Sequence, residues 1–161
     1  MRVFVPATLP MLHRWDSSRL IDAPSGFAVT PALRERYATG DSEELEYTAL
    51  THAAEASIRL LASDTDAPPR RVVVAADVDD AVPDAELGPA GVRLSPPLEL
   101  KSVAAVHADD ESAEPTVRAA IAAVSAADAG DSDAEFALDE AEALELSWYA
   151  TQEISDLLGG S

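Results

Sequence analysis

The sequence predicts one α/β (or α+β) domain over residues 1–161, in which a mixed sheet of about four or five strands is covered by amphipathic helices. Three observations support this prediction. Apolar runs of strand length alternate along the chain with segments of helical periodicity. The run at residues 72–76 is unbroken and apolar, as in a strand buried on both faces. A chain of 161 residues, 47% of them hydrophobic, can also close a single core.

The clearest helix covers residues 42–62. Asp41 with Glu44 three positions later forms a capping box at its start, and leucine and alanine fill one broad arc. Thr30 followed by Pro31 marks another helix start, because threonine caps helices and proline fits the first turn. In this part of the chain we expect strands at 2–8 and 27–30 and helices at 10–21, 31–37 and 42–62.

Turn residues and a second capping box organise the remainder of the chain. Prolines and glycines predict a loop over residues 79–91. Ser132 with Glu135 predicts a helix start, and the helical pattern that follows bends near Ala150. The remaining expected elements are the central strand at 70–77, an edge strand at 92–94, a strand at 98–107, helices at 112–126 and 132–158, and a frayed tail at 159–161.

Composition limits the compartment and the partners. The chain has no Cys, which excludes disulfides, thiolate zinc sites and cysteine nucleophiles and fits a reducing compartment. Its formal charge of −19 repels phosphate backbones and anionic lipids. No segment approaches the roughly 20 apolar residues that span a bilayer, and the N-terminus lacks a signal-peptide pattern. We therefore expect a cytoplasmic protein that binds neither nucleic acid nor membranes directly.

The carboxylates are concentrated toward the C-terminal end. Residues 128–156 carry ten of them and no basic residue. Such a segment can capture a basic protein surface, or it can form solvated helix faces. Because the acids alternate with apolar residues, the pattern favours solvated faces.

One group of residues suggests a metal site. Asp77 and Asp79 end one predicted strand, and His107 and Asp109 end another. Such ligands suit Mg²⁺ or Ca²⁺, and the two groups would meet if the strands ran parallel. In a chain this acidic, however, loop carboxylates are common, and Asp109 can simply cap the next helix. We therefore expect no cofactor, with Mg²⁺ or Ca²⁺ as the alternative.

A second group suggests a binding surface. Glu46 lies near the apolar arc of its helix beside Tyr47, where burial would perturb a carboxylate. Trp148, Tyr149 and Gln152 combine scarce aromatic rings with a polar group that could line a pocket or partner surface. The pattern favours a structural role instead, with Glu46 favouring the helix dipole and the rings packing against the sheet.

Several segments together resemble a family of short acidic conserved actinobacterial proteins of unknown function. The resemblance spans nearly the whole chain and implies a bacterial cytoplasmic protein, with no catalytic residue carried over. The segments are MRVFVPAT at residues 1–8, FAVTP at 27–31, EELEY at 43–47, RVVVAADV at 71–78, and WYA with QE at 148–153.

No standard hydrolase, nucleotide-binding or zinc-protease motif occurs, which favours a non-enzymatic protein. We expect a binding or regulatory module that engages a basic protein surface. One alternative is a divalent-metal-dependent hydrolase that uses the acidic strand ends. Another is an obligate homo-oligomer with a structural role.

Overall fold

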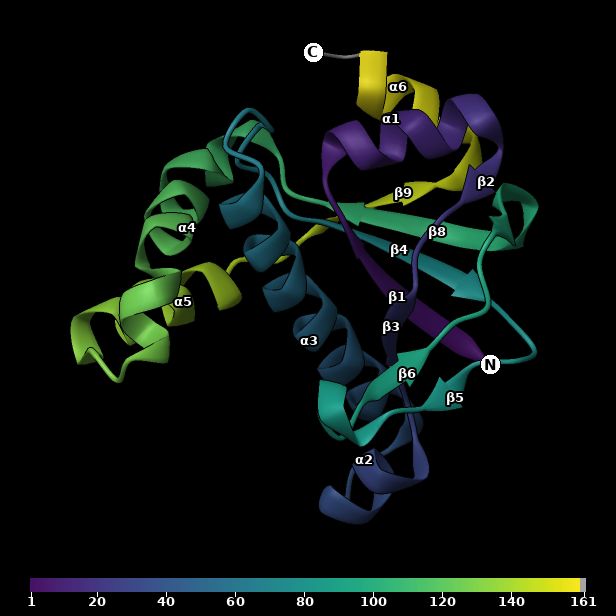
Figure 1. Cartoon of the computed structure of the whole chain (residues 1–161), viewed down its shortest axis with the longest axis horizontal. Helices are drawn as coiled ribbons and strands as arrows, with labels where there is room; N and C mark the ends of the chain where they lie inside the picture. The colour runs from purple at the N-terminus through teal and green to yellow at the C-terminus, as the bar shows by residue number, and fades with distance from the viewer. Residues whose placement is uncertain (160–161) are drawn as a thin grey trace.

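The computed structural model describes residues 1–159 and consists of nine strands and six α-helices (Figure 1). The strands are β1 (Arg2–Ala7), β2 (Leu20–Ile21), β3 (Ser25–Ala28), β4 (Val72–Asp77), β5 (Val82–Pro83), β6 (Gly91–Arg93), β7 (Leu98–Glu99), β8 (Val103–Ala108) and β9 (Ser147–Ala150). The helices are α1 (Leu9–Ser18), α2 (Pro31–Arg36), α3 (Ser42–Ser63), α4 (Glu114–Asp128), α5 (Ser132–Glu142) and α6 (Ile154–Gly159).

Seven strands form one sheet in the order β5-β6-β3-β1-β4-β8-β9, and β2 pairs with β7 separately. The predicted α/β class and the central strand are confirmed. β4 lies between β1 and β8, and its side chains alternate between two buried clusters, Val72 and Val74 on one face and Val73 and Ala75 on the other. The apolar run is therefore covered on both sides, as its composition predicts.

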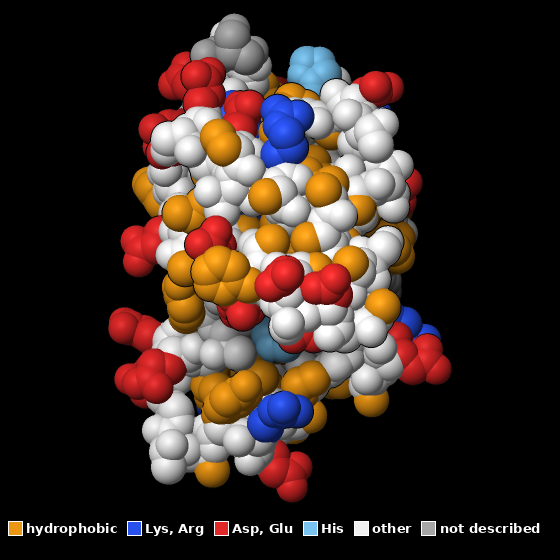
Figure 2. All heavy atoms as spheres, turned by 90° about the vertical axis from the view of Figure 1, so that its left-hand side faces the viewer, with side chains coloured by type: hydrophobic (Ala, Val, Ile, Leu, Met, Phe, Trp, Pro, Cys, Tyr) orange, Lys and Arg blue, Asp and Glu red, His pale blue; other side chains and the backbone are white. Residues whose placement is uncertain are grey.

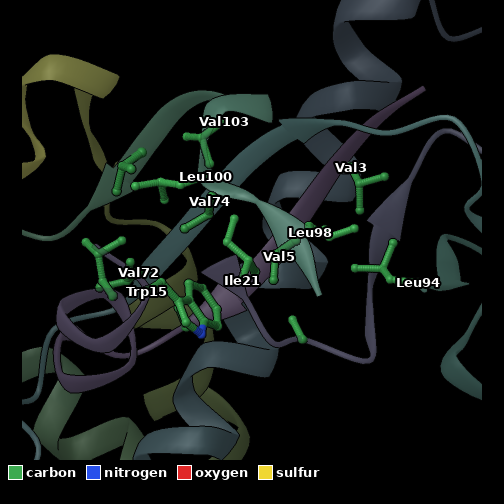
Figure 3. Packing of buried hydrophobic residues seen from close by; sticks show 14 of the residues in the cluster. Val3, Val5, Trp15, Ile21, Val72, Val74, Leu94, Leu98, Leu100 and Val103 are labelled. Carbon is green, nitrogen blue, oxygen red and sulfur yellow. The ribbon is translucent and has the colours of Figure 1, made fainter. Parts of the chain in front are cut away.

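Different elements cover the two faces of the sheet. On one face, Val5 of β1 and Val74 of β4 join Trp15 of α1 and Ile21 of β2 in a single cluster (Figure 3). α6 contributes Ile154 to that cluster. The other face packs on α3, and α4 and α5 lie outside α3 (Figure 1). On this side α4 and α5 therefore form a further helical layer, separated from the sheet by α3.

Ser57 joins α3 to the sheet. Its buried hydroxyl donates to the Ala7 carbonyl at 2.7 Å and accepts from the Val72 N–H at 3.1 Å. These two backbone groups lie at the end of β1 and the start of β4. A short polar residue on an otherwise apolar helix face thus satisfies both groups, which would be costly to bury unpaired.

Two of the predicted caps are confirmed and one is displaced. The Thr30 hydroxyl accepts from the Leu33 N–H, and the Asp41 carboxylate accepts from the Glu44 N–H at 2.8 Å. α5, however, begins one residue earlier than the Ser132 cap implies. Asp131 is the N-cap and accepts from two N–H groups of the first turn, because a carboxylate can accept more than one such bond.

The sheet differs from the prediction in size and direction. Every strand pair is antiparallel, whereas we expected a mixed sheet of fewer strands. Residues 82–83, inside the predicted loop, form the edge strand β5, so β6 lies within the sheet. Residues 147–150, predicted as helical, form β9 at the opposite edge. Strands this short have too little periodicity to be separated from loop or helix by pattern.

Within residues 1–159 no helix is both long and apolar enough to cross a membrane. Gly159 is the last residue of α6, and the rest of the predicted frayed tail, residues 160–161, lies outside the described residues.

Candidate functional site

A cavity of about 470 Å³ opens between α3, α5 and the connection from α5 to β9. α5 packs mainly on α4, where the small side chains of Ala134 and Ala141 are buried, and this packing leaves space between α5 and α3. Tyr47 and Thr51 of α3 also line the cavity. Its apolar lining consists of Leu50, Ala54, Ile58, Leu138, Leu144 and Leu146.

Carboxylates line the same cavity. In residues 1–159 only one of them has an ion-pair partner, with Arg59 3.5 Å from Glu55. Figure 2 views the molecule from the side of α4 and α5 and shows acidic groups spread over this face, with hydrophobic atoms exposed between them. The cavity is therefore negatively charged, and in residues 1–159 almost none of its carboxylates is paired with a cation of the protein itself. The five acidic residues are Glu55, Glu135, Asp139, Glu142 and Glu145.

A buried ion pair supports the cavity from the sheet side. Arg71 lines the cavity but is only 2% exposed, and its Nε and Nη2 each donate to a carboxylate oxygen of Asp109 at 2.8 Å. Nη2 also donates to the Leu144 carbonyl at 3.1 Å. The guanidinium thereby holds the connection after α5 against the start of β4. Because Asp109 neutralises it, Arg71 adds no net charge to the cavity.

The predicted binding residues are only partly brought together. Tyr47 lines the cavity with 56% of its surface exposed, and Glu46 next to it is exposed rather than buried in the apolar arc. Trp148 is 61% exposed on β9, so the expectation that it packs against the sheet is wrong. Tyr149 points to the opposite face and packs on the core there. Gln152 is exposed beyond the strand.

The four predicted metal ligands do not converge. β4 and β8 are antiparallel, and His107 pairs with Val73. Asp77 lies four residues farther along β4, at a separation of roughly 13 Å from that pair. Asp77 is held by Arg2, with 2.8 Å between Oδ1 and Nε, while Asp79 is exposed and Asp109 is buried with Arg71. The condition for a shared site, parallel strands, is not met. In the described part of the chain no three His, Asp or Glu side chains form a group that could hold a metal.

His107 pairs with Val73, which packs on α3, so it lies on the α3 side of the sheet, directly opposite Trp148 on the neighbouring strand. Burial lowers the pKa of His107, since desolvation disfavours the charged imidazolium. The side chain is half-buried and neutral near pH 7.

Most of the cavity could not be predicted from the sequence, although one signal was present. Glu135, Asp139 and Glu142 recur at helical spacing and so share one face of α5, together with Leu138. An acidic face with an apolar residue in it differs from a purely solvated face. Arg71 had no such signal, because its partners lie 38 and 73 residues away.

A second hollow, of about 420 Å³, lies between α1 and α6. Its lining includes Leu9, Leu157 and the basic residues His13, Arg14 and Arg70. Arg70 already donates to the Asp109 carbonyl at 2.9 Å. The cavity between α3 and α5 is the stronger candidate because its carboxylates are largely unpaired.

Comparison with known proteins identifies the chain by family. It matches no curated protein and no solved structure. One family model, DUF6912, matches residues 1–158 and is described as a family of unknown function. The match covers nearly all of the sequence and confirms the resemblance to a family without an assigned activity. The chain therefore belongs to the DUF6912 family of unknown function.

Proposed function

We propose that the protein is a binding module whose cavity between α3 and α5 takes a cationic, partly apolar segment of another protein. The observation that carries the proposal is the lining of this cavity, where leucine side chains stand beside carboxylates with few partners. Apolar walls favour burial of a ligand's hydrophobic part, and unpaired carboxylates select a positive charge at its edge. The net charge of −19 steers basic partners toward the molecule over longer distances.

Two synthetic peptides test the proposal directly. One alternates Lys and Val and has strand periodicity, and the other places Lys and Leu at helical spacing. Versions with Glu in place of Lys serve as charge controls. We expect at least one Lys peptide to bind in calorimetry, with an affinity that falls as salt is raised, and neither Glu peptide to bind.

Matched variants locate the binding. The triple variant Glu135→Gln, Asp139→Asn, Glu142→Gln removes three carboxylates from the cavity and should weaken Lys-peptide binding by about tenfold. The control Asp133→Asn, Glu140→Gln, Glu111→Gln removes three exposed carboxylates that do not line the cavity. An equal loss in both variants would show general charge attraction and would refute the cavity as the site.

A further inference from the structure

The edge of the sheet at β9 is open. Among residues 1–159, β9 is the last strand of the sheet and pairs only with β8. The opposite edge strand, β5, has two residues and ends at Pro83, which cannot donate to another strand. β9 has four residues, Ser147–Ala150, with neither a charge nor a proline among them. An open edge without these protections can pair with another chain.

Hydrogen bonding shows which backbone groups face outward. The Ala150 N–H donates to Glu153 Oε1 at 2.9 Å and is therefore turned away from β8. In an antiparallel ladder the outward-facing residues alternate, so Trp148 also directs its N–H and C=O away from β8. In residues 1–159 these two groups of Trp148 have no other partner. The Glu153 carboxylate already accepts the outward N–H of Ala150. Trp148 is therefore the residue of β9 whose outward backbone groups are available to pair with another strand.

The open edge adjoins the cavity. Leu146 lines the cavity two residues before Trp148 and packs against the buried cluster on the α3 side of the sheet, the same side on which Trp148 lies. A strand added beside Trp148 would continue past Leu146 and Glu145 toward the unpaired carboxylates. The exposed Trp148 ring would offer a surface for an aliphatic or cationic side chain of that strand.

We infer that the partner segment binds in extended form, as an additional strand beside β9, with its backbone paired to Trp148 and a Lys or Arg side chain at the cavity carboxylates. This inference rests on the proposed function and names the mode of recognition, β-strand addition. The occupant is a basic segment of another protein. A second copy of this chain would bring another −19 charge and a second set of cavity carboxylates to the same edge.

A pair of substitutions separates the backbone of Trp148 from its ring. Trp148→Ala removes the ring and keeps the N–H, whereas Trp148→Pro removes both. Proline is tolerated where the N–H of an edge strand faces solvent, so the fold should persist, and circular dichroism checks this. For the Lys–Val peptide we expect Trp148→Pro to bind about tenfold more weakly than Trp148→Ala. The helical Lys–Leu peptide should show no such difference.

N-methylated peptides test the same contact on the unaltered protein. Methyl groups on the N–H groups of one edge of the Lys–Val peptide should abolish binding, and methyl groups on the other edge should not. Strand addition would be overturned if the two N-methylated peptides bound with equal affinity. It would also be overturned if Trp148→Pro and Trp148→Ala bound the Lys–Val peptide with equal affinity. If the helical peptide still bound and still required the α5 carboxylates, the proposed function would stand. If light scattering showed dimers of the unaltered protein that Trp148→Pro dissociates, the occupant would be a second copy of this chain and the inference would be overturned.

Discussion

Arg71 and Asp109 form an ion pair in the interior, with side chains 2% and 0% exposed. Asp109→Asn leaves the guanidinium charge buried without compensation, and we expect the free energy of unfolding to fall by about 3 kcal/mol or more. Asp77→Asn is the matched control, because its ion pair with Arg2 is exposed and should contribute at most about 1 kcal/mol. Urea unfolding measures both variants, and similar losses for the two would contradict the assigned role of burial.

The stability of the protein should also depend on pH through His107. Burial lowers the pKa of His107 in the folded state, so between the folded pKa and the unfolded value of about 6.5 the unfolded chain binds more protons. The contribution of His107 to stability is therefore lost as the pH falls below about 6.5. His107→Gln should flatten this part of the stability profile measured by urea unfolding. An unchanged slope in the variant would show that His107 does not titrate there.

At the scale of elements, α5 forms one wall of the cavity and depends on its cap. Asp131 accepts hydrogen bonds from the N–H groups of Asp133 and Ala134, at 2.9 and 3.2 Å. Asp131→Ala should reduce stability by about 1 kcal/mol and, by loosening the wall, should also weaken binding of the Lys peptides. Asp131→Ser should retain most of both, since serine also caps helices. If Asp131→Ala bound the peptides as tightly as the wild type, the order of α5 would not matter for the cavity.

For the whole molecule, the charge of −19 predicts a stability that depends on salt. Raising the ionic strength from 0.01 to 0.15 M shortens the screening length from about 30 to about 8 Å, which weakens repulsion among the surface carboxylates. The Tm at pH 7 should therefore rise. Near pH 4.2, the isoelectric point, the same salt series should have little effect. Equal shifts at the two pH values would point to a general salt effect instead of self-repulsion.

The β4 strand, the α3 helix and the caps at Thr30 and Asp41 could be predicted because each depends on residues close together in the sequence. The edge strands β5 and β9 could not, since a short strand exists only through its pairing with a neighbour. The same limit applies to the site. The acidic face of α5 is visible as a spacing, but its distance from α3 depends on how α5 packs against α4.

The sequence by itself determined the α/β class, the buried central strand, the negative charge and the membership of a family without an assigned activity. These are properties of composition and local pattern, in which burial and capping leave a direct trace. Only the tertiary structure decided that the strands are antiparallel, which separates Asp77 from His107, and that Arg71 meets Asp109 and Leu144 beside an acidic cavity. Those contacts join positions far apart in the chain, and the pairing of strands and the packing of helices alone bring them together.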